Sequence, residues 1–299
     1  MRKVLAWPGS SLAAALAAQL GCECAELAIH RFPDGEQLVR IDTDVTGCEV
    51  VLVAGLERAD AKFLPIAFAC DAARELGARR IVLVAPYLGY MRQDQRFQRG
   101  EAVSSRTFAR LLSSVADALV TVDPHLHRWT KLSQIYSIPA QVVPAAEPIA
   151  QWIKQHVQSP LVVGPDAESR QWAARIASLA DAPCVVLEKV RSGDSEVSVT
   201  LGDAVPAGRW TPVLVDDIAS TGRTFIAAAA ALRRAGLHNP VAVAVHALLD
   251  EESLAAVRMA GVHEFVSCDT VEHSTNAIAM APALAHGLRE IKNAPDRAD

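Results

Sequence analysis

The sequence lacks several features that mark large classes of proteins. Its six cysteines include no Cys-x-x-Cys pair, which argues against a disulfide framework and against a zinc site. No uninterrupted apolar run reaches membrane-spanning length, and the polar start MRKVLAWPGSS is unlike a secretion signal. Lys and Arg do not outnumber Asp and Glu, and the net charge of −5 argues against a general nucleic-acid binder. We therefore expect a cytoplasmic protein without a nucleic-acid or membrane partner, which binds anionic ligands through local groups.

No GxxxxGK[ST] motif is present, so P-loop kinase chemistry is unsupported. What is present is an ordinary globular composition, with 51% hydrophobic and 21% charged residues. A length of 299 residues allows one large domain or two of average size, with ample chain for a buried core.

Short β-branched runs alternate with alanine-rich stretches of helical periodicity, a pattern that predicts an α/β protein with parallel sheets. Strands are expected at 49–55, 80–86, 118–123, 160–166, 182–189, 211–217, 240–249 and 262–269, and helices at 63–78, 104–116, 168–180, 223–235 and 251–260. The pattern restarts after the stretch 141–151, where we expect the boundary between the two halves. This favours two similar domains, 1–143 and 144–299, with the last helix packing back on the first. Asp34-Gly35 predicts a hairpin over 30–42.

The stretch VLVDDIASTGRTF (213–225) places two carboxylates, Asp216 and Asp217, at the end of a buried strand. Ligands of open α/β sheets bind at this end of the strands. Gly222 would let the turn approach a ligand, and a helix starting near Arg223 would point free N–H groups at the same place. Hydroxyl donors are Ser220, Thr221 and Thr224. These groups suit a phosphate, while the aspartates suit sugar hydroxyls or water-bound Mg²⁺; an acidic strand end with a helix N-cap is the alternative.

This stretch resembles the loop that binds ribose 5-phosphate groups in the phosphoribosyltransferase fold. More of the chain resembles one family, the ribose-phosphate pyrophosphokinases. The segments that carry this resemblance are FPDGE (32–36), PYLGYMRQDQRF (86–97), VDPHLH (122–127), GPDAESRQWAARIA (164–177), EKVRSG (188–193) and DTVEHSTNAIAMAPALAHGL (269–288). They follow the family's order and cover nearly the whole chain. The resemblance implies two phosphoribosyltransferase-like domains, with ATP on the first and ribose 5-phosphate on the second.

The chemistry implied by the resemblance is transfer of the pyrophosphoryl group of ATP to the anomeric hydroxyl of ribose 5-phosphate, with Mg²⁺ as cofactor. Such a transfer depends on positioning and charge neutralisation more than on a nucleophilic side chain. Lys189 and Arg191 would be the catalytic cations, and His125 and Asp166 the metal-site residues. The implied ATP-binding residues are Phe32, Asp34, Glu36, Arg92, Gln93 and Asp94; those for ribose 5-phosphate are Asp216, Asp217, Ser220, Thr221, Gly222, Arg223 and Thr224. Hairpin 30–42 would serve a neighbouring subunit, which implies a homo-oligomer.

The sequence also departs from the family's usual pattern. Ser220 stands in place of an acid, Arg223 in place of a small residue, and Glu168-Ser169 in place of two glycines. Two alternatives to the enzyme therefore stay open, a catalytically silent regulatory homologue and a phosphoribosyltransferase. His125-x-His127 also leaves open a zinc site, although no third close cysteine or histidine completes it.

Overall fold

The computed structural model describes residues 1–126, 128–192, 196–202 and 205–291, with backbone alone for 189–192, 196–199 and 201. The chain divides into two compact units. The first comprises Met1–Val143 together with the chain from Ala281 onward, and the second comprises Pro144–Met280. Each unit has its own buried core. The expected fold class, an α/β protein with two sheets flanked by helices, is confirmed.

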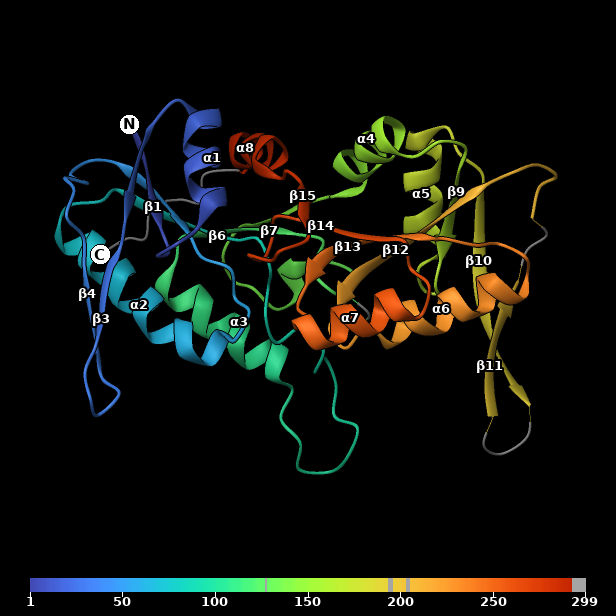
Figure 1. Cartoon of the computed structure of the whole chain (residues 1–299). Coiled ribbons are helices and arrows are strands. Elements are labelled where there is room, and N and C mark those ends of the chain that lie inside the picture. Colours follow the sequence, from blue (N-terminus) through green and yellow to red (C-terminus); the bar gives the residue numbers. More distant parts are fainter. Residues whose placement is uncertain (127, 193–195, 203–204, 292–299) are drawn as a thin grey trace. The chain divides into compact units, whose positions relative to one another are not determined.

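The first unit contains a six-stranded parallel sheet in the order β2-β1-β5-β6-β7-β8 (Figure 1). Its strands are β1 (Arg2–Ala6), β2 (Glu23–Glu26), β5 (Glu49–Val53), β6 (Arg80–Ala85), β7 (Ala118–Val122) and β8 (Ala140–Val143). Every residue of β5, β6 and β7 is buried, because helices cover both faces of the sheet. These are the continuous apolar runs that the sequence pattern assigned to buried strands.

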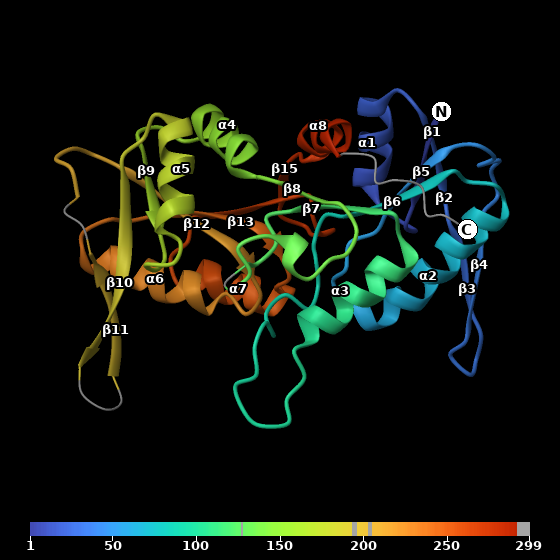
Figure 2. The same cartoon turned by 180° about the vertical axis from the view of Figure 1, so that it is seen from behind.

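Two pairs of helices cover the two faces of this sheet (Figures 1 and 2). One pair is α1 (Ser11–Leu20) and α8 (Ala281–Glu290), and the other is α2 (Ala59–Glu75) and α3 (Ser104–Val115); a 3₁₀ turn, η1, spans Leu132–Gln134. A separate antiparallel hairpin joins β3 (Ala28–Arg31) to β4 (Gln37–Arg40), and Gly35 in its turn has φ +94°. The hairpin is thus where the Asp34-Gly35 signal predicted it.

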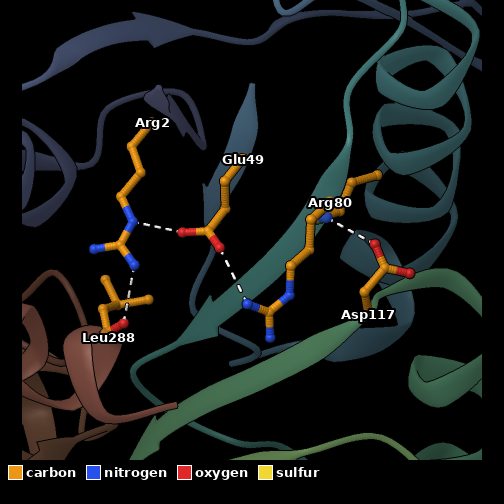
Figure 3. A network of polar contacts seen from close by, with 6 residues as sticks. Arg2, Glu49, Arg80, Asp117 and Leu288 are labelled. Atoms are coloured by element: carbon orange, nitrogen blue, oxygen red, sulfur yellow. Dashed lines mark hydrogen bonds and ion pairs between the residues drawn. The ribbon is translucent and has the colours of Figure 1, made fainter. Parts of the chain in front are cut away.

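A buried ionic network joins α8 to the sheet of the first unit (Figure 3). Glu49, which is 7% exposed, pairs with both Arg2 and Arg80. The guanidinium of Arg2 also donates to the main-chain oxygen of Leu288 in α8, at 3.1 Å. These residues lie at the amino ends of β1, β5 and β6. The network therefore stabilises the end of the sheet opposite to the carboxyl ends of the strands, where a ligand is predicted.

The second unit contains a seven-stranded sheet in the order β11-β10-β9-β12-β13-β14-β15, parallel except for β11. Its strands are β9 (Pro160–Gly164), β10 (Cys184–Ser192), β11 (Glu196–Leu201), β12 (Thr211–Ala219), β13 (Val241–Ala247), β14 (Glu264–Cys268) and β15 (Asn276–Ile278). Its helices are α4 (Ala146–His156), α5 (Arg170–Ala180), α6 (Arg223–Arg234) and α7 (Glu251–Met259). Helices α4 and α5 lie on one face and α6 and α7 on the other (Figure 1).

The interpretation of 141–151 as the boundary was incomplete. This stretch contains the end of strand β8, which pairs with β7, and the first half of helix α4. Helix α4 buries Ile149, Trp152 and Ile153 on its inner side. The boundary between the units falls in the short connection between the two elements. No helix of the described residues is long and apolar enough to cross a membrane.

Candidate functional site

The paired aspartates of the second unit lie within β12, which extends two residues beyond the predicted strand 211–217. Strand β12 continues to Ala219, and Asp216 is in register with Ala244 of β13. The main-chain N–H of Asp217 donates to Oδ1 of Asp216 at 3.0 Å. Strand β12 stays paired with β13 after its buried residues end. The aspartates therefore lie on a paired strand, at the side of the sheet where a ligand is predicted.

Negative charge gathers around Asp216. Burial, together with the carboxylates of Asp217 and Asp166, raises the pKa of Asp216 to about 8. The structure thus brings together three of the predicted site residues, which come from β12 and from the loop after β9. A group of hydrogen-bond donors or a cation at this place would relieve the repulsion, so the carboxylates suit sugar hydroxyls or a divalent cation.

Asp166 is held by a tight turn with Ser169, which precedes α5. The hydroxyl of Ser169 donates to the main-chain oxygen of Asp166 at 2.6 Å, and the N–H of Ser169 donates to Oδ1 of Asp166 at 3.1 Å. Gly164 leaves room for this turn, since a Cβ there would lie 2.6 Å from Oγ of Ser169. Ser169, one of the departures from the family pattern, is therefore built into the geometry of the Asp166 turn.

The turn that follows β12 leads directly into the N-terminus of α6. Gly222 is the N-cap residue with φ +69°, and as a glycine it has no side chain to cap the first N–H groups of the helix. Ser220 is half-buried, whereas Thr221, Arg223 and Thr224 are exposed around this helix end. The arrangement is a set of hydroxyl and N–H donors of the kind that binds phosphate.

Gly222 also has a packing role within the second unit, beside its predicted role towards a ligand. It is buried, and a Cβ added to it would lie 2.4 Å from Cγ2 of Val257 in α7. The glycine is therefore required by its left-handed backbone and by close packing on α7. Close approach of a ligand is not needed to explain it.

In the first unit, the residues predicted to bind ATP follow β6, in a segment that we call the RQD loop (residues 92–101). Arg92 is exposed and Gln93 is half-buried. Asp94 is only 8% exposed, and its carboxylate accepts the main-chain N–H of Arg128 at 3.2 Å. The ion pair between Asp94 and Arg128 is longer, at 3.8 Å. Asp94 is thus placed to join the RQD loop to the loop that follows β7.

His125 is half-buried in that second loop, just beyond the carboxyl end of β7. Strands β6 and β7 are neighbours in a parallel sheet, so their following loops emerge at the same edge. The structure therefore brings His125, Arg92 and Gln93 to one edge of the first unit. Asp166, the other predicted metal-site residue, belongs to the second unit.

The tip of the hairpin carries Phe32, Asp34 and Glu36. Phe32 is 40% exposed and makes an edge-to-face contact with His30, with ring centroids 4.7 Å apart. The carboxylate of Asp34 accepts the main-chain N–H of Glu36 at 3.1 Å. In both views the hairpin tip and the RQD loop project from separate parts of the first unit (Figures 1 and 2). Within one chain, these two groups of predicted ATP-binding residues do not meet.

The predicted catalytic cations lie on the long hairpin formed by β10 and β11. Lys189 and Arg191 belong to β10, in register with Val199 and Val197 of β11. The side chains of these two residues lie outside the described part of the structure, as do residues 193–195 and His127. The strand predicted over 182–189 therefore extends to Ser192.

For a metal ion, the described residues offer no group of three or more His, Cys, Asp or Glu side chains that could hold one. Mg²⁺ prefers oxygen ligands and usually keeps several waters while it contacts substrate phosphates. The carboxylates around Asp216 fit a cation held in that manner, because they supply oxygen atoms and negative charge close together. Nothing in this set has the closed tetrahedral character of a structural zinc site.

Sequence reasoning missed three residues that shape the site. Ser169 and Val257 act through the contacts described above, and the carboxylate of Glu101 accepts hydrogen bonds from within the RQD loop. The Asp-x-x-Ser spacing of 166–169 is a turn signal that could have indicated the first of these. The other two depend on contacts between distant parts of a unit or within an irregular loop.

Comparisons with known proteins cover almost the whole chain. Residues 8–115 match the N-terminal domain of ribose phosphate pyrophosphokinase, and residues 132–283 match the phosphoribosyl transferase domain. The ribose-phosphate pyrophosphokinase of Methanopyrus kandleri is 35% identical over 285 residues, 95% of this chain and 97% of that protein. That of Halobacterium salinarum is 35% identical over 93% of this chain and 97% of its own length. The crystal structure of phosphoribosylpyrophosphate synthetase from Mycobacterium smegmatis superposes with a TM-score of 0.82 at 25% identity, covering 97% of this chain and 98% of the other.

The parallel sheets and the donor-lined turn before α6 define the class of protein, an α/β protein built from two phosphoribosyltransferase-like units. Within that class, the chain belongs to the ribose-phosphate pyrophosphokinase family. The resemblance inferred from the sequence motifs is confirmed.

Proposed function

We propose that this protein transfers the pyrophosphoryl group of ATP to the anomeric hydroxyl of ribose 5-phosphate, giving phosphoribosyl pyrophosphate and AMP. The observation that carries the proposal is that relatives with this name match both units in one continuous alignment. A phosphoribosyltransferase that consumes the product would use the second unit only. The second unit offers the phosphate-binding turn and the carboxylates, and the first offers the exposed Arg92 and Gln93.

Each group has a task in this reaction. The hydroxyls of Ser220, Thr221 and Thr224, with the N-terminus of α6, bind the 5-phosphate. Asp216 and Asp217 accept hydrogen bonds from the ribose hydroxyls and so orient the sugar. Arg92 and Gln93 bind the nucleotide. Lys189 and Arg191, on the β10–β11 hairpin, neutralise the charge that develops on the triphosphate.

Mg²⁺ is the cofactor that we propose, and His125 and Asp166 are the residues that would contact it. When bound, it would neutralise phosphate charge and favour the reactive geometry of the triphosphate. Histidine is an unusual ligand for Mg²⁺, so His125 would contact the ion through a water molecule. The carboxylate of Asp166 is already oriented by Ser169, which keeps it beside Asp216.

Incubation with ATP, Mg²⁺ and ribose 5-phosphate tests the activity directly. We expect equal amounts of AMP and phosphoribosyl pyrophosphate, quantified by anion-exchange chromatography. Formation of ADP in place of AMP would contradict the proposal, because it would mean transfer of a single phosphoryl group. No nucleotide turnover would favour a silent regulatory homologue, and turnover only with added phosphoribosyl pyrophosphate and a base would favour a phosphoribosyltransferase.

We further propose a homo-oligomer, at least a dimer, in which the hairpin over 30–42 completes the nucleotide site of a neighbouring subunit. This is supported by the exposed Phe32 and by the separation of the hairpin tip from the RQD loop within one chain. Sedimentation gives the size of the assembly. Mixed refolding gives its architecture, because inactive Asp34→Ala and inactive Lys189→Ala subunits should restore activity when they assemble together. Failure of every mixture to regain activity, or full activity of a monomer, would contradict the shared site.

We place the protein in the cytoplasm. None of the six cysteines forms a disulfide, and three of them, Cys48, Cys70 and Cys268, are buried, which suits a reducing compartment.

A further inference from the structure

Glu101 closes the RQD loop on itself. One atom of its carboxylate, Oε2, accepts three hydrogen bonds: from the main-chain N–H of Phe97 at 2.8 Å, from that of Gln98 at 3.1 Å, and from the side-chain amide of Gln93 at 3.3 Å. The main-chain oxygen of Glu101 accepts Nε–H of Arg96 at 3.0 Å. The N–H groups of Phe97 and Gln98 hold the pKa of Glu101 below its usual range, so the side chain is ionised at neutral pH.

This carboxylate controls the orientation of Gln93. The amide nitrogen of Gln93 donates to the main-chain oxygen of Gln95 at 3.0 Å as well as to Glu101. The two hydrogens of that amide group are therefore both directed into the loop. The main-chain oxygen of Gln93 also accepts the N–H of Ser105, in the first turn of α3, at 3.2 Å.

The tip of the loop is exposed from residue 96 to residue 100, and the Phe97 side chain is 62% exposed. An exposed tip of this kind has little burial to hold it, so hydrogen bonds carry a larger share of its order. Glu101 supplies two of these bonds to the tip and a third to Gln93, and in this way it couples the shape of the tip to a residue of the nucleotide site.

We propose that Glu101 is a positioning residue for the nucleotide, whose carboxylate fixes the RQD loop in the form that presents Arg92 and Gln93 to ATP. The identity of the ligand rests on the function proposed above. The claim that Glu101 stabilises the loop conformation rests on the hydrogen bonds alone. The ligand and the stabilisation of the loop can therefore be tested separately.

Limited proteolysis measures the hold on the loop without any ligand. Arg96 and Arg99 are exposed trypsin sites within the loop, and cleavage after them requires local opening. In Glu101→Ala we expect cleavage at these two sites to be about 10-fold faster, since each lost hydrogen bond weakens the closed form. Glu101→Gln should stay within about 3-fold of the wild-type rate, because its carbonyl oxygen has two lone pairs and can still accept two of the three bonds. Glu75→Ala, which removes an exposed glutamate at the end of α2, is the matched control.

Calorimetric titration of the full chain with α,β-methylene-ATP measures the consequence for the nucleotide. We expect about 10-fold weaker binding in Glu101→Ala, near-normal binding in Glu101→Gln and Glu75→Ala, and unchanged binding of ribose 5-phosphate in all three. Unchanged cleavage in Glu101→Ala would overturn the proposal, as would faster cleavage with unchanged affinity for the analogue. If the wild-type protein bound no analogue, the proposed function would fail instead, and the cleavage rates would still decide whether Glu101 holds the loop.

Discussion

Gly222, at the start of α6, packs directly against Val257 of α7: a Cβ built on Gly222 would lie 2.4 Å from Cγ2 of Val257, and the glycine has φ +69°. The turn proposed to bind phosphate is thus locked to the neighbouring helix by a contact that only glycine permits. The shape of this turn therefore depends on the packing of α6 against α7.

Replacement of Gly222 should therefore destabilise the protein before it affects any ligand. We expect Gly222→Ala to lower the free energy of unfolding by about 2–4 kcal/mol, combining backbone strain with overpacking. Gly236 is a matched control, since it has φ +77° with nothing within 4 Å of an added Cβ. Gly236→Ala should cost about 1 kcal/mol, the strain alone. Urea unfolding of both variants, and of Gly222→Ala combined with Val257→Ala, checks this; equal losses at the two glycines would contradict it.

Arg223 follows this glycine and is exposed at the N-terminus of α6. If it contacts the 5-phosphate, Arg223→Ala should weaken ribose 5-phosphate binding by about one to two powers of ten, since a charge-assisted contact is worth roughly 1.5–3 kcal/mol. Affinity for an ATP analogue should change little. Arg234→Ala removes the same charge from the other end of α6 and should leave both affinities near normal. Loss of ATP binding with normal sugar binding would contradict the assignment of this turn.

Asp94 and Arg92 lie two positions apart but should behave differently on substitution. Asp94 is 8% exposed and accepts the main-chain N–H of Arg128, whereas Arg92 is exposed. We expect Asp94→Ala to lower stability by about 1–3 kcal/mol, because it removes the charged acceptor of the part-buried N–H of Arg128. Arg92→Ala should leave stability unchanged and raise the KM for ATP. Thermal unfolding and steady-state kinetics of both variants separate the two roles, and a fully stable Asp94→Ala protein would refute the structural one.

The raised pKa of Asp216 predicts an unusual pH dependence of stability. Its ordinary value is 3.8 and its folded value is about 8, so between these pH values the folded protein retains a proton that the unfolded chain has lost. The contribution of Asp216 to the free energy of unfolding is therefore fully present below about pH 4, and it is lost as the pH rises towards 8. We expect the difference in unfolding free energy between Asp216→Asn and wild type to grow in favour of the variant over this range, by up to about 6 kcal/mol, because each pKa unit is worth about 1.4 kcal/mol. A difference that does not vary with pH would contradict the shift.

Much of the fold could be predicted because its signals are local. The buried strands β5, β6 and β7 are continuous apolar runs, and the hairpin turn at Asp34-Gly35 has the expected residues. The site turn before α6 was also visible, since a glycine and hydroxyls follow a strand. Residue type and order were enough for these elements.

The remaining features depend on contacts between residues distant in sequence. The sequence predicted that the last helix packs back on the first domain, but it did not show that α1 is its partner there or that Arg2 binds a carbonyl oxygen of Leu288. The burial of Asp94 and the packing of Gly222 on Val257 also depend on residues that are distant in sequence. In both cases the residue type suggested a contact with ligand, whereas the partner in the structure is another part of the protein.

The fate of the β-phosphorus of ATP tests the central claim most directly. With ribose 5-phosphate, Mg²⁺ and ATP labelled with ³²P at the β position, the proposed reaction moves the label into phosphoribosyl pyrophosphate and leaves AMP unlabelled. Lys189→Ala should slow this transfer by orders of magnitude while binding of an ATP analogue is kept, because its charge acts mainly in the transition state. Label that stays with the nucleotide as ADP, or that appears only as free pyrophosphate, would contradict pyrophosphoryl transfer to the sugar.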